Sequence, residues 1–292
     1  MHADEVDIDT DLVRRLVAAQ HPRWASLEVT PVLPGGTDNA LYRLGSELVV
    51  RLPRHAVSVP SLEKELAYLP RLRDLPLAIP KVLVRGEPGE GYPFPWAVLC
   101  WVAGEMATAE HLADPDDAMR ALAAFIHTLR RQETTGGPPP GGRGGPLAPR
   151  DAAMRGAVGA MGERIDGRAV LALWEDALAA PVWAGPGVWI HGDLDSRNVL
   201  ASGGRICGVV DWGSCAVGDP ACDVMVAWKM VPRGLRDVFR QLLAVDDATW
   251  RRARGWVLSQ ALIALGYYTH ENNAVLVDEA WRWLNEVLAE AG

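Results

Sequence analysis

The spacing of apolar residues changes near residue 104, and this change limits the chain to a fold with two differently built parts. Before that point, LEVTPVLPGGTDNALYRLGSELVVRLPR is typical of three short strands, and KVLVRG and WAVLCWV indicate two more. Between these strands, the apolar residues of 60–72 recur at the spacing of a helix, and the same spacing dominates after residue 104. The pattern predicts an α+β fold, with a small sheet in residues 1–101 and mainly helices in residues 102–292.

The helical part is divided by a segment too rich in glycine and proline for a regular element. Asp114 and Pro115 are suited to begin a helix that continues to about Arg131. The segment GGPPPGGRGGP follows, and we interpret it as a surface connection, with a flexible lid as the alternative. Helices are predicted again in residues 151–180 and from about Pro220 onward, with two short strands between them.

Composition excludes several classes of partner. The 292 residues carry a formal net charge of −8, whereas nucleic-acid binding needs clustered lysine and arginine. The sequence has no run of about 18 apolar residues, and its acidic start, MHADEVDIDTD, is unlike a signal peptide. Four cysteines form no C-x-x-C pair, which fits reduced thiols. We therefore expect a cytoplasmic protein that binds neither nucleic acid nor membrane, and nothing in the sequence implies a protein partner.

Three polar residues follow short apolar segments in the second half of the chain. Asp193 and Asn198 share the turn in VWIHGDLDSRNVL, and Asp211 ends the next predicted strand, GRICGVVD. If the two strands pair antiparallel, the three side chains converge at one end. Carboxylate and amide oxygens suit Mg²⁺, and one carboxylate can stay off the metal to accept a proton. These groups are the ones that phosphoryl transfer requires.

The same residues lie in two motifs of a known family. H-G-D-L-x-x-x-N-V-L, from His191, followed by V-V-D-W-G, from Val209, resembles the aminoglycoside phosphotransferase family, antibiotic kinases with a protein-kinase-like fold. G-D-P-A-C-D, residues 218–223, is similar to the family's next segment. The resemblance covers nearly the whole chain and implies two lobes. Residues 1–101 would form a nucleotide-binding lobe with an antiparallel sheet, and residues 102–292 a helical lobe with the catalytic turn and acceptor site.

The resemblance also implies an activity and a metal. The γ-phosphate of ATP, with GTP possible, would pass to a hydroxyl of a small molecule, most readily an aminoglycoside-type antibiotic. Asp193 would orient and deprotonate this hydroxyl, and Asn198 and Asp211 would bind Mg²⁺ between the ATP phosphates. His191 would brace the turn, and Asp219 and Asp223 would hold the loop and the N-terminus of the helix that follows rather than touch substrate.

Nucleotide contacts are expected in the first lobe. No G-x-x-x-x-G-K-[ST] segment is present, so a P-loop is excluded. The resemblance instead places Gly36 and Thr37 at the phosphates. It places the backbone of residues 99–102 at adenine, with Cys100 and Val102 as the contacts.

Arg51 occupies the position where kinases have a lysine. It would hold phosphate and pair with a glutamate on the next helix, which is either Glu65, in ELAYLPRL, or Glu63. Because arginine departs from the family pattern here, a second class of function stays open: a catalytically silent nucleotide-binding protein.

Acceptor contacts are expected on the catalytic turn and the last helices. Asp195 and Glu271 are the main candidates, because carboxylates suit the ammonium groups of an aminoglycoside. Further polar candidates are Asn272, Asn273 and Glu279. The aromatic residues that would instead form an apolar pocket for a macrolide are Trp228, Trp256, Tyr267, Tyr268 and Trp281. A third class of function, a metal hydrolase with His191 and Asp193 as ligands, lacks further histidines at ligand spacing.

Overall fold

A computed structural model describes residues 5–33 and 38–290 of the chain. The chain divides into two compact units. Unit 1 consists of residues 1–104 together with 208–213, and unit 2 consists of residues 105–207 and 214–292. Unit 1 therefore contains a short segment, 208–213, that lies far beyond the boundary expected at residue 101.

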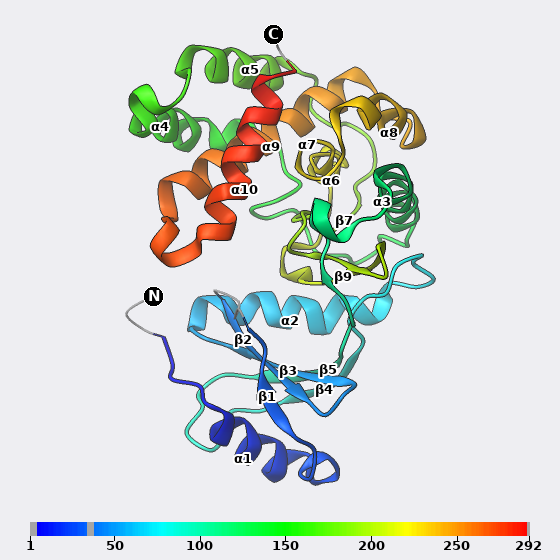
Figure 1. Ribbon diagram of the computed structural model, residues 1–292, viewed down its shortest axis with the longest axis vertical. Helices are drawn as coiled ribbons and strands as arrows, with labels where there is room; N and C mark the ends of the chain where they lie inside the picture. Colours follow the sequence, from blue (N-terminus) through cyan, green and yellow to red (C-terminus); the bar gives the residue numbers. More distant parts are fainter. Residues whose placement is uncertain (1–4, 34–37, 291–292) are drawn as a thin grey trace. The chain divides into compact units, whose positions relative to one another are not determined.

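Unit 1 contains a five-stranded sheet in which all neighbouring strands are antiparallel (Figure 1). Its strands are β1 (Val29–Pro31), β2 (Asn39–Leu44), β3 (Leu48–Pro53), β4 (Val82–Gly86) and β5 (Trp96–Cys100). Their order in the sheet is β1-β2-β3-β5-β4. The sequence-based prediction of an α+β fold with a small antiparallel sheet is thus confirmed.

Two helices lie on opposite faces of this sheet (Figure 1). Helix α1 (Thr10–Gln20) packs its apolar side into the core of unit 1, which includes Val50 and Leu52 of β3. Side chains alternate between the faces of a strand, so Arg51 points to the other face. Helix α2 (Val59–Tyr68) lies there.

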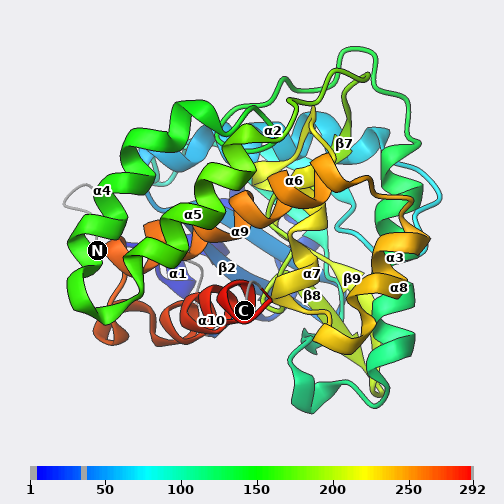
Figure 2. The same cartoon turned by 90° about the horizontal axis from the view of Figure 1, so that it is seen from above.

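Unit 2 is built around one long helix. Its helices are α3 (Pro115–Arg130), α4 (Asp151–Met161), α5 (Gly167–Ala179), α6 (Ala221–Val224), α7 (Val226–Lys229), α8 (Arg236–Leu242), α9 (Asp247–Tyr267) and α10 (His270–Leu288). Helices α4, α5 and α10 surround α9 (Figure 2). Helix α9 is buried along most of its length, and its buried residues include polar ones such as Arg252 and Gln260. None of the helices in the described part of the chain is both long and apolar enough to span a membrane.

Short strands position the turn that contains Asp193. Strand β7 (Val188–Ile190) pairs antiparallel with β10 (Ala216–Gly218). Strand β8 (Val199–Ser202) lies between β6 (Glu105–Met106) and β9 (Arg205–Val209) in a second small sheet. Residues 191–198 therefore connect two strands that belong to different sheets, and both ends of the turn are held by backbone pairing.

Candidate active site

Gly192 sets the conformation in which the chain enters the turn. Its φ of +86° lies in the left-handed region, and a Cβ there would lie 2.6 Å from the carbonyl oxygen of Ser214. Any side chain at this position would therefore strain the backbone and clash. The glycine of the H-G-D motif is required by this close approach.

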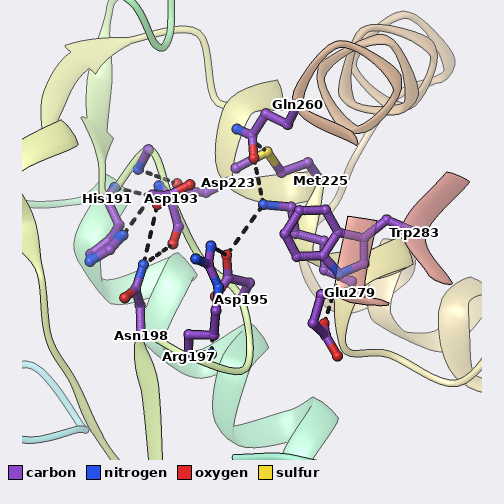
Figure 3. A network of polar contacts seen from close by, with 12 residues as sticks. His191, Asp193, Asp195, Arg197, Asn198, Asp223, Met225, Gln260, Glu279 and Trp283 are labelled. Carbon is purple, nitrogen blue, oxygen red and sulfur yellow. Dashed lines mark hydrogen bonds and ion pairs between the residues drawn. The ribbon is translucent and has the colours of Figure 1, made fainter. Parts of the chain in front are cut away.

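Asp223 is hydrogen-bonded to the backbone of the turn (Figure 3). Its two carboxylate oxygens accept the N–H groups of His191 and Gly192, each at 2.8 Å. Burial raises the pKa of Asp223, whereas His191 and the two N–H groups favour its ionised form. Nearby, Asp219 forms a buried ion pair with Arg252, with 2.7 Å between Oδ2 and Nε. Both acids thus make buried structural contacts, and the roles that the resemblance implies for them stay predictions.

Asn198 reaches back across the turn to Asp193 (Figure 3). Its Nδ2 donates to the backbone carbonyl of Asp193 at 2.9 Å and to Oδ2 of Asp193 at 3.3 Å. The amide nitrogen is therefore turned towards Asp193, and Oδ1 is the atom of Asn198 that can bind a cation. An amide oxygen fits Mg²⁺, which prefers oxygen ligands and takes the remaining ones from phosphates and water.

Asp195 is completely buried within the turn, with 0% of its side chain exposed. Its Oδ2 lies 2.6 Å from Nη2 of Arg197, and its Oδ1 accepts the backbone N–H of Arg197 at 3.0 Å. Its backbone carbonyl accepts the N–H of Asn198 at 3.1 Å. An acceptor could bind this carboxylate only by replacing Arg197 or another partner, so the predicted acceptor contact stays a proposal.

Lys229, at the end of α7, is fully buried beside Asp195. Its Nζ donates to Oε1 of Gln260 at 2.5 Å, lies 3.8 Å from Oδ2 of Asp195, and lies 4.2 Å from the ring centre of Trp283. Burial lowers the pKa of Lys229, and Asp195 opposes this effect. The turn is thereby connected to α9 through Gln260 and to α10 through Trp283.

The glycine- and proline-rich segment 136–146 also reaches the turn. The carbonyl oxygens of Pro138 and Gly144 accept backbone N–H groups from Val217 and Asp219, both at 2.8 Å. Nη2 of Arg143 lies 3.7 Å from Oδ1 of Asp193. Interpreting this segment as a plain surface connection therefore misses a cation placed beside the predicted base. No spacing pattern connects residues 143 and 193, so the sequence carries no signal for it.

In unit 1, Arg51 forms ion pairs with two acids. Its Nε lies 3.1 Å from Oε2 of Glu65, and its Nη2 lies 2.9 Å from Oδ1 of Asp211. Oε1 of Glu65 also accepts the N–H of Trp212 at 2.6 Å. Glu63, the alternative partner, is bound instead to Arg85 on β4, at 2.7 Å.

Burial affects the two ends of this ion pair differently. It raises the pKa of Glu65 to about 7, although Arg51 beside it favours the carboxylate. Burial alone would lower the pKa of Arg51, but Glu65 and Asp211 outweigh it and the pKa is raised. Arg51 therefore stays a fixed cation at neutral pH.

Asp211 has a backbone conformation that is uncommon for its residue type. Its φ of +62° lies in the left-handed region, which costs free energy for a residue with a Cβ. Its side chain is 51% exposed while Oδ1 is bound to Arg51. A carboxylate that is both accessible and fixed fits a magnesium ligand.

The other residues predicted to contact nucleotide or acceptor have different surroundings. Gly36 and Thr37 lie outside the described residues. The N–H of Cys100 donates to the carbonyl of Lys81 at 2.8 Å, so adenine would have to replace that bond to use this amide. Val102 follows β5 and is buried, and Glu271 is exposed in the first turn of α10.

Solved structures share this fold along nearly the whole chain. The GDP complex of wild-type aminoglycoside 2'-phosphotransferase-IIIa is 20% identical, with a TM-score of 0.73 over 98% of this chain and 100% of that one. The GDP and kanamycin complex of APH(2″)-IIIa gives the same identity and TM-score, over 95% and 98% of the two chains. Macrolide 2'-phosphotransferase MphH from Brachybacterium faecium is 24% identical, with a TM-score of 0.59 over 96% and 98%. A search of curated proteins finds no match.

The sequence itself matches a family along most of its length. Residues 29–256 match the Phosphotransferase enzyme family, APH, and this segment contains both motifs and the Arg51 ion pairs. The structural similarities add the kinase-like fold of its enzymes. The chain therefore belongs to the APH phosphotransferase family.

Proposed function

We propose that the protein transfers the γ-phosphate of ATP, or of GTP, to a hydroxyl group of a small molecule. The observation that carries this proposal is the geometry of the H-G-D-L-x-x-x-N turn. There, Asn198 is hydrogen-bonded to Asp193, and Asp223 fixes the backbone of His191 and Gly192. A carboxylate held in this way can orient a hydroxyl and accept its proton. Family membership supports a phosphotransferase over a metal hydrolase.

The roles of the predicted residues follow from this reaction. Asp193 is the base, and Asn198 and Asp211 are each proposed as ligands of Mg²⁺. When bound, Mg²⁺ would neutralise negative charge on the phosphates. Arg51, held by Glu65, is proposed to bind phosphate, because its guanidinium is a fixed, planar donor.

The other proposed nucleotide contacts follow the family pattern. Gly36 and Thr37 would meet the phosphates, and the backbone of Cys100 and Val102 would meet adenine. Solved family structures that contain GDP or ADP support a nucleotide site of this kind.

An aminoglycoside-type acceptor is the first candidate. Family relatives solved with kanamycin, streptomycin and gentamicin support it, and Asp195 and Glu271 remain its proposed contacts. A macrolide is the second candidate, supported by the similarity to MphH. The structure narrows the aromatic residues that could serve it, because Trp228 and Trp256 are buried in the core, whereas Tyr267 is 58% exposed.

A turnover assay tests the proposal. Purified protein, Mg²⁺ and ATP or GTP would be incubated with kanamycin, gentamicin, streptomycin and a 14-membered macrolide, and products would be identified by mass spectrometry. We expect an acceptor-dependent gain of one phosphoryl group. Nucleotide binding by calorimetry with no product from any acceptor would instead support the silent nucleotide-binding protein that Arg51 left open.

We further propose a cytoplasmic location. All four cysteines are free thiols in the structure, which fits a reducing compartment. Fractionation of the native host would test this, and recovery outside the cytoplasm would contradict it.

A further inference from the structure

We propose that Arg143 is a further catalytic residue, whose guanidinium binds oxygens of the phosphoryl group while it is transferred beside Asp193. This inference rests on the proposed function of Asp193 as the base. It assigns a chemical role to the glycine- and proline-rich segment 136–146, which contains neither of the two family motifs.

The backbone on both sides of Arg143 is fixed. On one side, the carbonyl of Gly142 accepts Nη1 of Arg150 at 3.0 Å. On the other, the carbonyl of Gly144 accepts the N–H of Asp219 at 2.8 Å. Gly144 has a φ of +75°, and a Cβ there would lie 2.4 Å from Cδ1 of Ile190 in β7. The glycines therefore let the segment pack closely against the strand that leads into the turn.

The Arg143 side chain is close to Asp193 without being locked to it. The Nη2–Oδ1 distance is 3.7 Å, whereas a charge-assisted N–H···O bond is typically about 2.7–2.9 Å. Arg143 is 27% exposed and Asp193 is 24% exposed, so both can meet a ligand. Among the residues that the structure describes, the buried Nε of Arg143 has no hydrogen-bond partner, which leaves donor capacity unused.

Distances place the reacting phosphorus within reach of this guanidinium. A base must lie roughly 2.6–3.2 Å from the hydroxyl oxygen it deprotonates. That oxygen must lie roughly 3–3.5 Å from the atom it attacks. The phosphorus then lies no more than roughly 6–7 Å from the carboxylate of Asp193. Nη2 of Arg143 lies 3.7 Å from the same carboxylate, so this guanidinium and the phosphorus would both lie within about 7 Å of it.

Two other cations near the turn are paired with a different acid. Arg197 lies 2.6 Å from Asp195, and Lys229 is buried against the same carboxylate at 3.8 Å. Arg143 is instead paired with Asp193 itself. The planar guanidinium of Arg143 can donate two N–H groups to phosphate oxygens. A cation at this position would also stabilise the negative charge on the transferred phosphoryl group.

Kinetics of Arg143→Ala and Arg143→Lys test the proposal. Loss of one preorganised donor to developing charge costs about 10²–10³ in kcat. We expect this loss in Arg143→Ala, a KM for the acceptor within about threefold of wild type, and partial recovery of kcat with added guanidinium ions. Arg143→Lys should restore less of the wild-type kcat than added guanidinium does, because an ammonium lacks the planar set of N–H donors of a guanidinium. Arg120→Met is the matched control, since Arg120 is an exposed arginine on α3 paired with Asp116, and its kcat should be unchanged.

A binding measurement keeps this inference separate from the proposed function. Calorimetry would compare Mg²⁺–ADP alone with Mg²⁺–ADP plus aluminium fluoride, which mimics the transferred phosphoryl group and needs no acceptor. Arg143→Ala should weaken the aluminium fluoride complex at least tenfold and leave ADP binding unchanged. Equal binding of the complex by wild type and variant, or no complex with either, would overturn the role of Arg143. An increased acceptor KM with unchanged kcat would also overturn it, by making Arg143 an acceptor contact.

Discussion

Both units contain an acid–cation network, and the two networks are assembled from different kinds of sequence signal. In unit 1, Arg51 is bound to Glu65 and Asp211, which we call the Arg51 network. All three residues occupy positions that the kinase motifs anticipate. In unit 2, Asp195 is bound to Arg197 and Lys229, which we call the Asp195 network. Lys229 reaches it from a separate helix, and no motif anticipates this lysine.

The networks share one physical arrangement. Each has a buried acid, Glu65 in unit 1 and Asp195 in unit 2. The Arg51 network also contains the more exposed Asp211, and the partly exposed Asp193 lies two residues before Asp195 on the same turn. A buried ion pair contributes little net stability but fixes positions, because breaking it leaves an unpaired charge. From this comparison we expect the buried acids to fix the structure around them, and the more accessible acids, Asp211 and Asp193, to carry the chemistry.

The largest effect on kcat is expected when Asp193 is replaced. Replacement by Asn keeps the shape of the side chain and removes the charge that accepts the proton. We expect kcat to fall by about 10²–10⁴, the usual contribution of a general base, with Mg²⁺–ATP binding retained. The melting temperature should stay close to that of wild type, because the buried contacts of the turn are made by Asp195 and Asp223.

Steady-state kinetics and thermal unfolding of the same Asp193→Asn sample would check this. A large fall in melting temperature, with kcat retained in the folded fraction, would make Asp193 a structural acid. The division between buried acid and accessible acid would then fail for unit 2.

A smaller effect is expected when the cation of the Arg51 network is removed. Arg51→Met should raise the KM for ATP about 10–100-fold, since a hydrogen bond to a charged group contributes about 1.5–3 kcal/mol. The KM for the acceptor should change much less. Arg85→Met is the control, because Arg85 is an exposed arginine of the same sheet bound to Glu63. An unchanged KM for ATP would show that Arg51 only supports the structure.

Sequence reasoning succeeded where local pattern and motif spacing determine position. The strands around Arg51 follow from alternating apolar residues and turns, and the structure contains all of them as one antiparallel sheet. Motif spacing singled out Glu65 along with Glu63, and the structure pairs Arg51 with Glu65. Asn198 and Asp193 were placed on one turn, and they are hydrogen-bonded there.

Contacts that tertiary packing makes between distant segments cannot be predicted in this way. Arg143 lies in a segment without periodicity, and its contact with Asp193 depends on close packing of Gly144 against β7. Asp195 is buried beside Lys229 of α7, which itself contacts Gln260 of α9 and Trp283 of α10. Residues 208–213 belong to unit 1 although they follow the helical half of the sequence. Neither the local composition nor the residue spacing of the sequence indicates any of these positions.

The smallest expected effect concerns the buried lysine of the Asp195 network. The groups that act on Lys229 are Asp195, Asp193, Arg143 and Arg197, and burial is the largest influence, so its pKa in the folded protein is lowered. In the unfolded chain a lysine has a pKa of about 10.4. Between the lowered pKa and about 10.4, the unfolded state binds more protons, so the free energy of unfolding rises with pH.

Lys229→Met removes this titration and keeps most of the side-chain volume. The free energy of unfolding of wild type minus that of Lys229→Met should therefore increase with pH. The increase should be about 1.4 kcal/mol for each unit that separates the two pKa values, and it should level off above about pH 10.4. Urea unfolding of both proteins between pH 7 and 11 measures this difference directly. A difference that is constant with pH would mean that Asp195 offsets burial fully and keeps Lys229 as firmly charged as Arg51. The buried acids of the two networks would then be electrostatically equivalent.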